Sequence, residues 1–434
     1  MPTDLASLPV AIVGAGPVGL AAAAHLLERG LCPVVLEAGA SAGRAVSAWG
    51  HVRMFSPWRY DIDKACRRLL EAEGWVEPDA EHHPTGAEFV ARYLAPLAST
   101  AALAPRIRYG QHVVAIARAG LGKVQDRGRG DAPLEVRTRD AAGREATLYA
   151  RAVIDASGTW DRPNPAGASG LPAPGETGAA AAIRYGMPDV LGRDRGRHAG
   201  RTTMVVGSGH SATGTLIDLV RLAGEAQGTR IVWASRRKDV STAFGGGDAD
   251  QLPERGALGT RLAELVASGR INVRAPFSVE RIETAADGRL RVAGATGCCN
   301  VVEEVDQLVV ATGFRPDLAV LAELRLSLDP ALECPAALGP LVDPNLHSCG
   351  TVRPHGAEEL AHPEPGFWIA GMKSYGRAPT FLMATGYEQV RSIAAEIAGD
   401  REGARRVELD LPETGVCSAA LVGAPEVASG GCCG

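Results

Sequence analysis

VAIVGAGPVGLAAAAHLLERG (10–30) is the stretch of the sequence that decides the fold. It begins with a short apolar run, which predicts a buried strand, and this run ends in glycines. The alanine-rich part, 17–30, predicts a helix that ends at a glycine, and CPVVLEAG (32–39) predicts a second buried strand. A strand, a helix and a strand within about thirty residues form the βαβ unit of parallel sheets.

The glycines between the first strand and the helix follow the GxGxxG spacing. Gly14 permits a tight turn, Gly16 lets the backbone approach a pyrophosphate, and Gly19 lets the helix pack closely on the strand. Amide groups at the start of such a helix point at the phosphates. Glu37 ends the second strand, where a carboxylate accepts hydrogen bonds from ribose hydroxyls. The residues expected at this nucleotide site are Gly14, Gly16, Pro17, Gly19, Glu37 and Ala38.

A second unit of the same kind follows near residue 201, with a strand over 201–209, a helix over 210–224 and a strand over 229–237. Its loop reads GSGHSA, and its second strand ends in SRRK instead of an acid. Cations at this place suit a 2′-phosphate and favour NADPH over NADH, although a solvated basic turn would look the same. The residues expected here are Gly207, Gly209, His210, Ser211, Ala212, Arg236 and Arg237.

The order of the two units indicates the cofactors. An acid-ended site suits the adenosine of FAD, whose ribose bears no phosphate, and the basic-ended site suits NADPH, so the pattern implies a flavin that NADPH reduces. After each unit, alternating segments predict a small antiparallel sheet and a closing strand.

We therefore expect an α/β protein with two Rossmann-like dinucleotide-binding domains, each with a small antiparallel β insertion, and with the NADPH domain inserted into the FAD domain. The expected boundaries are 1–165 and 303–400 for the FAD domain, 166–302 for the NADPH domain, and 401–434 for a poorly ordered tail that contains cysteines.

Composition narrows the function classes. The 434 residues carry a net charge of −5, which gives no electrostatic basis for binding nucleic acid. No apolar run reaches the roughly 18 residues that a membrane span needs, because glycines and a proline interrupt 10–27. The nine cysteines are an odd number spread over a long chain, which does not suit a framework of disulfide bonds. We therefore expect reduced thiols and a cytoplasmic protein. The expected partner is a small-molecule substrate, and the candidate assembly is a homodimer.

At this point the sequence resembles flavoproteins with two dinucleotide-binding domains, a group that includes flavin monooxygenases and pyridine-nucleotide oxidoreductases. VIDASGTWDRPNP (153–165) and LVVATGFRPD (308–317) look like the hinge motifs of that group, and GFWIAGM (366–372) resembles its strand beneath the flavin. The resemblance implies further flavin neighbours, namely Arg44, Trp49, Met54, Phe55, Val113, Gly371, Pro379 and Thr380.

Two segments indicate a substrate class. GMKSYGRAPTFLMATGYEQVRS (371–392) and LPETGVCS (411–418) resemble flavoproteins encoded beside bacterial arsenic-resistance genes. The adjacent cysteines near the end of the chain resemble the metal-delivering tail of mercuric reductase, and thiolates suit trivalent arsenic. This implies a metalloid site at Cys417, Cys432 and Cys433, or else an idle tail.

The main expectation is a flavin monooxygenase-like enzyme that oxidises a soft nucleophile, such as trivalent arsenic, sulfur or an amine. A flavin reductase that uses the tail cysteines for a metalloid or disulfide is the first alternative, and a non-catalytic FAD-binding redox sensor is the second. Neither the CxxC spacing of disulfide reductases nor the FxGxxxHxxx[YF] spacing of monooxygenases is present. The candidate catalytic residues are Lys373, Tyr375 and Arg377, just before the helix that would face the flavin.

Overall fold

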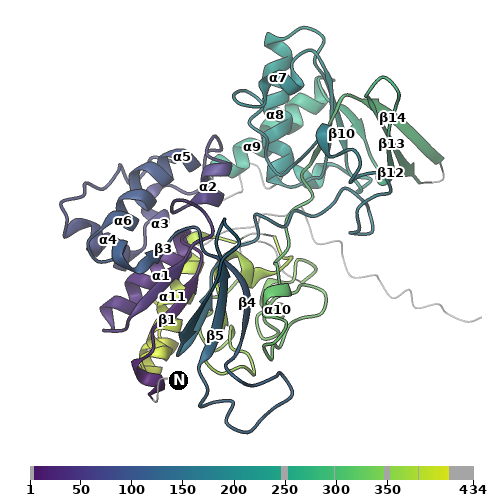
Figure 1. The fold of residues 1–434 in the computed structure, drawn as a ribbon. Helices are drawn as coiled ribbons and strands as arrows, with labels where there is room; N and C mark the ends of the chain where they lie inside the picture. Colours follow the sequence, from purple (N-terminus) through teal and green to yellow (C-terminus); the bar gives the residue numbers. More distant parts are fainter. Residues whose placement is uncertain (1–3, 246–252, 298, 347–351, 380, 410–434) are drawn as a thin grey trace, which may run out of the picture.

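The structure, a computed structural model, describes residues 4–245, 253–297, 299–346, 352–379 and 381–409. It consists of two lobes, each built on a five-stranded parallel sheet, and two chain segments connect them (Figure 1). This arrangement confirms the expected α/β class with two Rossmann-like units.

The first sheet carries the N-terminal βαβ unit. All of its strand pairs are parallel. In spatial order its strands are β16 (Phe367–Ile369), β7 (Ala152–Asp155), β1 (Val10–Val13), β2 (Pro33–Leu36) and β3 (Ile107–Arg108). The order places β1 in the centre, so the loop that follows β1 leaves from the middle of the sheet edge.

The two faces of the first sheet are covered by different layers, because the side chains of a strand alternate between faces. Val10 and Ile12 pack in one cluster with helices α1 (Pro17–Glu28) and α11 (Met383–Ile397). Ala11 and Val13 pack on the opposite face with an antiparallel sheet. The strands of that sheet are β4 (His112–Arg118), β5 (Leu134–Arg139) and β6 (Glu145–Ala150).

A group of short helices extends this lobe on the side of α1 (Figure 1). They are α2 (Arg44–Ala48), α3 (Trp58–Asp61), α4 (Lys64–Glu71), α5 (Gly86–Phe89), the π-helix η2 (Val90–Leu94) and α6 (Ala95–Ser99). Their apolar side chains, among them the fully buried Trp58, Phe89 and Tyr93, join the same core as α1.

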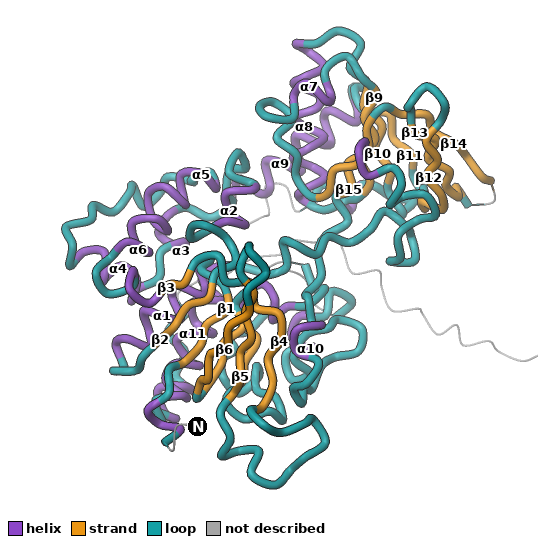
Figure 2. Tube along the Cα trace, in the orientation of Figure 1, coloured by secondary structure: helices purple, strands orange, loops and turns teal. Residues whose placement is uncertain are grey.

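The second lobe repeats the plan of the first. Its parallel strands, in spatial order, are β11 (Asn272–Arg274), β10 (Arg230–Ala234), β9 (Thr202–Val206), β15 (Gln307–Val310) and β8 (Ile183–Tyr185). Helices α8 (His210–Glu225) and α9 (Pro253–Ala267) cover one face, with α7 (Arg195–His198) nearby. An antiparallel sheet covers the other face and consists of β12 (Ser278–Thr284), β13 (Leu290–Thr296) and β14 (Cys299–Val305). Figure 2 shows both lobes with their layers of strands and helices.

Strand pairing bears on the expected boundary at residue 302. β15 pairs with β9 and β8, so the closing strand lies in the sheet of the second lobe. The pairings favour a boundary after residue 310, while the domain division as a whole stays a prediction.

The expectation of a poorly ordered tail from residue 401 is wrong for its first residues. Helix α12 (Arg401–Arg405) follows α11 directly and packs against it. The buried side chain of Arg391 donates to the carbonyl of Gly403, and Ser392 Oγ donates to the carbonyl of Ala404 at 2.6 Å. Sequence periodicity misses this helix because polar bonds from α11 hold it. Residues 410–434 lie outside the described residues.

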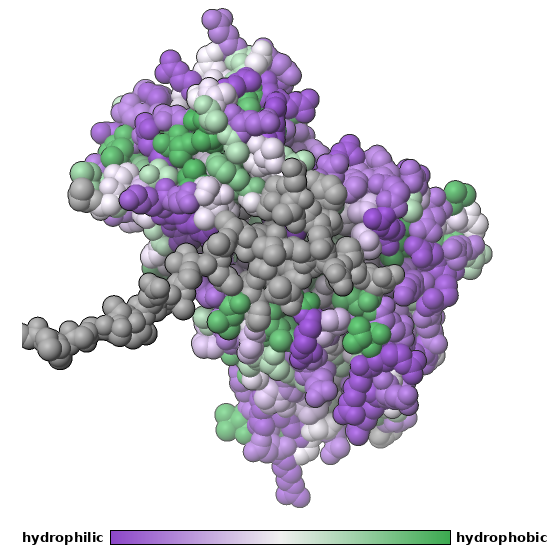
Figure 3. Space-filling model, turned by 180° about the vertical axis from the view of Figure 1, so that it is seen from behind, coloured by the Kyte–Doolittle hydropathy of each residue, from purple (hydrophilic) through white to green (hydrophobic). Residues whose placement is uncertain are grey.

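The two segments that connect the lobes run side by side. Asn164 donates from its backbone N–H to the carbonyl of Gly313 at 2.9 Å, and the rings of Trp160 and Phe314 stack with centroids 5.0 Å apart. Figure 3 shows the lobes from behind, where hydrophilic side chains cover most of the surface and apolar ones form small patches on both lobes. Within the described part of the chain, no helix has the length and apolar character to cross a bilayer.

Candidate functional site

The loop after β1 opens into a cavity of about 660 Å³. Gly14, Gly16 and Pro17 line it, together with residues that follow β2 and β7 and with the turn after β16. All of these segments leave the carboxyl ends of parallel strands, which is where open α/β sheets bind ligands.

The glycines of this loop differ in what a side chain would meet. A Cβ atom at Gly16 would have no heavy atom within 4 Å, so the backbone there faces open space. A Cβ at Gly19 would lie 2.0 Å from the carbonyl oxygen of Gly14, and Gly14 itself has a φ of +97°. Gly16 therefore leaves room for a group outside the protein, whereas Gly14 and Gly19 serve the turn and the helix packing.

Helix α1 presents its N-terminus to this space without a side-chain cap. Such an end offers backbone N–H groups and the positive end of the helix dipole, which together favour phosphate. Glu37, which is buried, anchors the other side of the loop. Its Oε2 accepts from the backbone N–H of Ala15 and its Oε1 from that of Gly39, both at 2.7 Å. Each oxygen keeps a further lone pair, so the carboxylate can also accept from a diol.

Further expected neighbours line the same cavity. Ala38, Arg44, Trp49, Val113 and Gly371 all contribute to its wall. Arg44 forms an ion pair with Asp161, a residue of the segment that connects the lobes. The hydrogen bond to Asp161 is the main cause that raises the pKa of Arg44 above its usual value.

A buried ion pair lies in the wall of the cavity. Lys373, in the turn η8 (Gly371–Tyr375), donates from Nζ to Asp155 Oδ2 at 2.6 Å and to Ser157 Oγ at 3.1 Å. Lys373 and Asp155 are each about 1% exposed. Asp155 Oδ1 also accepts from Ser157, through its backbone N–H at 3.1 Å and its hydroxyl at 2.6 Å. Of the three candidate catalytic residues, Lys373 is the one that lines the cavity.

Sequence reasoning singled out Lys373 but not its partner Asp155. The signal was present, since VID is a buried strand that ends in a carboxylate. A charge at the end of a buried strand needs a partner, because an unpaired buried charge is costly. Trp160 and Phe314 lie in the two hinge-like motifs and also line the cavity.

The second glycine loop has the same geometry as the first. A Cβ at Gly207 would lie 2.3 Å from the carbonyl oxygen of Ala311, whereas a Cβ at Gly209 would have nothing within 4 Å. Helix α8 begins at His210 without a side-chain cap on Gly209, and Ser211 and the fully buried Ala212 follow in its first turn.

The basic residues after β10 stand at the surface of the second lobe. Arg236 and Arg237 are exposed; Arg236 donates to the carbonyl of Ala168 at 3.0 Å and Arg237 to Thr242 Oγ1 at 3.1 Å. Both keep other guanidinium N–H groups that could bind a phosphate.

Some expected residues do not line the cavity. Met54 is buried in the apolar core around α1. The ring of Phe55 stands edge-on to that of His210 with centroids 5.1 Å apart, so the first lobe contacts the start of α8. Tyr375 is buried against Phe381, and burial raises its pKa. Arg377 and Pro379 are exposed.

Other expected residues fall outside the described ones, namely Thr380, Cys417, Cys432 and Cys433. Within the described part of the chain, Cys32, Cys66 and Cys334 have free thiols, and no group of three or more His, Cys, Asp or Glu side chains could hold a metal ion.

Three solved structures illustrate the fold. Bacillithiol disulfide reductase of Bacillus cereus matches with a TM-score of 0.66 and 18% identity over 90% of this chain and 99% of its own. The cadaverine monooxygenase DfoA of Erwinia amylovora, solved with FAD, matches with a TM-score of 0.63 and 13% identity over 95% of this chain and 98% of its own. The flavin-containing monooxygenase of Stenotrophomonas maltophilia matches with a TM-score of 0.55 and 21% identity over 90% of this chain and 98% of its own.

Among curated proteins, none matches this sequence significantly. The model of one protein family, the pyridine nucleotide-disulphide oxidoreductases, matches residues 11–336 and so spans both glycine loops and most of the chain. By this match the chain belongs to the pyridine nucleotide-disulphide oxidoreductase family and is an oxidoreductase.

Proposed function

We propose that this oxidoreductase holds FAD in the cavity at the first glycine loop and NADPH at the second, and that it works as a monooxygenase on a soft nucleophile. The observation that carries the cofactor assignment is the open space at Gly16, between an uncapped helix N-terminus and the buried Glu37 carboxylate. Gly209 repeats this space in front of α8, where exposed arginines follow the next strand.

Particular residues would hold each cofactor. For FAD these are the backbone at Gly16, the carboxylate of Glu37, the walls at Trp49 and Val113, and the turn at Gly371. For NADPH they are the backbone at Gly209, the start of α8, and Arg236 with Arg237 for the 2′-phosphate. When bound, FAD would supply the two-electron chemistry between NADPH and O2.

A monooxygenase turnover consumes one NADPH, one proton and one O2 for each substrate molecule. One NADPH and one proton supply two electrons and two protons; one oxygen atom of O2 goes to the substrate and the other leaves as water. The residues of this chain contribute position and exclusion of water. Met372, Phe381 and Met383 give the cavity an apolar wall, and Lys373 adds a fixed cation that the buried Asp155 orients.

Two features support oxygenation. No cysteine is among the residues that line this cavity in the described part of the chain. Beside its charged groups, the wall carries thioether and aromatic side chains, which suit an uncharged, polarisable substrate. We extend the proposal to trivalent arsenic, sulfur or an amine as the oxidised atom. The arsenical rests on the resemblance of 371–392 and 411–418 to flavoproteins of arsenic-resistance operons.

A reductase is the second candidate. The adjacent cysteines Cys432 and Cys433 in the sequence favour it, because a pair of thiols can pass electrons to a metalloid or a disulfide. A cytoplasmic location and a homodimer stay predictions under either candidate.

Labelled oxygen separates the candidates. Purified protein is supplied with NADPH, ¹⁸O2 and either trimethylarsine or an organic sulfide. A monooxygenase places one labelled atom in the product and consumes one O2 for each NADPH. An unlabelled product, or NADPH consumption that stops without Cys432 and Cys433, would instead support the reductase.

A further inference from the structure

Three polar side chains, together with backbone groups of Gly371 and Arg353, form a closed network behind the turn η8. Gln389 of α11 is fully buried, and its Oε1 accepts from the backbone N–H of Gly371 at 2.8 Å. Its Nε2 lies 2.9 Å from His355 Nε2 and 2.9 Å from Ser374 Oγ. Ser374 Oγ donates to the carbonyl of Gly371 at 2.7 Å. His355 Nδ1 lies 3.0 Å from the carbonyl oxygen of Arg353.

The partners fix where the protons lie. A carbonyl only accepts, so His355 Nδ1 carries a hydrogen toward Arg353. The N–H of Gly371 only donates, so Gln389 must turn its oxygen to Gly371 and its NH2 to His355. His355 Nε2 is then a bare acceptor, and the imidazole is neutral. Each hydrogen of the Gln389 amide has one acceptor.

A proton on His355 Nε2 would break this arrangement. The new N–H would face the NH2 of Gln389 at 2.9 Å, donor against donor. Rotating the Gln389 amide by half a turn would satisfy His355 but would place its NH2 against the N–H of Gly371. No orientation of Gln389 serves both a protonated His355 and Gly371.

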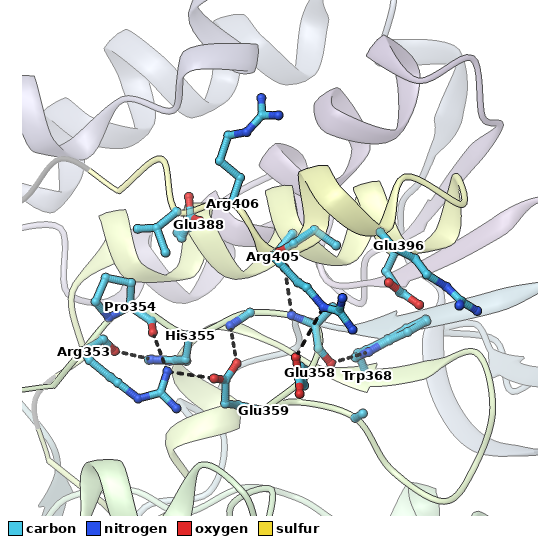
Figure 4. A pocket seen from close by; sticks show the side chains of 17 residues that line it. Arg353, Pro354, His355, Glu358, Glu359, Trp368, Glu388, Glu396, Arg405 and Arg406 are labelled. Atoms are coloured by element: carbon cyan, nitrogen blue, oxygen red, sulfur yellow. Dashed lines mark hydrogen bonds and ion pairs between the residues drawn. The ribbon is translucent and has the colours of Figure 1, made fainter.

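The network joins two cavities. Gly371 lines the cavity at the first glycine loop, whereas His355 lines a second cavity of about 600 Å³. Figure 4 shows His355 among the side chains of this second cavity, with its bond to Arg353. A proton from solvent can therefore reach His355 without entering the first cavity.

We propose that His355 and Gln389 are positioning residues for the flavin site, and that protonation of His355 from the second cavity releases Gly371 and loosens the grip of η8 on FAD. The proposal rests on the proposed function for the identity of the ligand alone. The same turn carries Lys373, so release also affects the buried ion pair in the wall of the first cavity.

Burial and the charged groups around His355 decide the pH range in which it takes up a proton. Arg353 and Glu359 face it from its own segment, Glu388 from α11, and the ring of Tyr375 from η8 at 5.7 Å. Burial, as the largest cause, lowers the pKa of His355, against a smaller opposing effect of its bond to the Arg353 carbonyl and of the two carboxylates.

Other charged groups also line the second cavity. They are Glu358, Glu396, Arg401, Arg405 and Arg406. Because the pKa of the folded state is depressed, the contribution of neutral His355 is complete above about pH 6.5. It is lost as the pH falls below that value toward the lowered pKa.

The test measures FAD dissociation from the holoprotein between about pH 8 and about pH 5, where free histidine titrates. For the unchanged protein we expect the dissociation constant to rise about tenfold toward low pH, the effect of one buried donor left without an acceptor. His355→Gln keeps an acceptor that does not titrate, so its dissociation constant should change less than about twofold. Gln389→Glu should reverse the trend, because its second oxygen accepts from protonated His355.

The outcomes separate the parts of the account. A pH trend in His355→Gln equal to that of the unchanged protein would overturn the proposal, and so would a flat profile in the unchanged protein. Thermal unfolding of the cofactor-free protein gives a second measure. There the free energy of unfolding of the unchanged protein, taken relative to that of His355→Gln, should fall as the pH drops below about 6.5. If no FAD binds at any pH, the proposed cofactor fails, and this second comparison alone decides the network.

Discussion

Lys373 and Asp155 meet inside the wall of the first cavity, with Nζ and Oδ2 2.6 Å apart and both side chains about 1% exposed. The pair ties the turn after β16 to the end of β7, two neighbouring strands of the first sheet. Its position gives the wall of the cavity a cation and an anion that solvent screens little.

Removing one partner of this pair leaves the other charge buried without compensation. We expect Asp155→Asn or Lys373→Met to lower the free energy of unfolding by about 3–5 kcal/mol. The double variant should lose less than the sum of the single losses, because it leaves no unpaired charge. Chemical denaturation of the four proteins measures this. As a control, Glu145→Gln, which removes the exposed partner of Arg139, should leave the stability unchanged.

The glycine loops offer a test that separates binding from folding. Gly16→Ala meets nothing within 4 Å and has a backbone that alanine accepts, so the protein should fold normally. The added methyl group occupies the space proposed for the pyrophosphate, and FAD affinity should fall about a hundredfold (about 2.7 kcal/mol). Gly19→Ala should instead prevent folding, because its Cβ would lie 2.0 Å from the carbonyl of Gly14.

The matched change in the second loop is Gly209→Ala. It should keep FAD bound while it raises the KM for NADPH. Loss of FAD in Gly209→Ala, or unchanged affinities in both alanine variants, would contradict the assignment of the loops.

Coenzyme preference depends on the basic residues after β10. With both Arg236 and Arg237 changed to Ser, we expect kcat/KM for NADPH to fall by about a hundredfold or more, because each charged hydrogen bond to phosphate contributes about 1.5–3 kcal/mol. Values for NADH should change little. Steady-state oxidation of both coenzymes measures the ratio, and Arg230→Ser at the opposite end of β10 is the control. An equal fall in kcat/KM for NADH would show that the arginines do not act through the 2′-phosphate.

Asp61 of α3 makes the stability depend on pH. Burial raises its pKa to about 8, its Oδ1 accepts from Ser56 Oγ at 2.6 Å, and within the described residues its buried Oδ2 has no hydrogen-bond partner. The folded protein holds a proton there that the unfolded chain releases near pH 4. The contribution of Asp61 to the stability should therefore fall as the pH rises from about 4 to about 8, by at most about 1.4 kcal/mol per pH unit.

Asp61→Asn should remove this slope while it keeps the acceptor for Ser56. Thermal unfolding at a series of pH values measures the difference. Glu71→Gln, at the exposed end of α4, should retain the slope of the unchanged protein. If Asp61→Asn has the same slope as the unchanged protein, Asp61 does not hold the proton.

Local patterns predict one part of this molecule well. The glycine loops, the strands β1, β2, β9 and β10, and the helices between them follow from short segments, because turn geometry and apolar periodicity are properties of neighbouring residues. Glu37 follows from its spacing to Gly19 for the same reason.

Contacts between distant residues could not be predicted in this way. Lys373 and Asp155 are 218 positions apart, and their meeting depends on β16 lying beside β7. The network of His355 and Gln389 likewise joins segments that only the folded sheet brings together. Helix α12 lacks apolar periodicity of its own and depends on polar side chains of α11.

The visible spectrum of the purified protein tests the central claim most directly. The account predicts a yellow protein that carries one FAD per chain, or takes up one when FAD is added, and that NADPH bleaches when air is excluded. A well-folded, colourless protein that binds no FAD at neutral pH would contradict it.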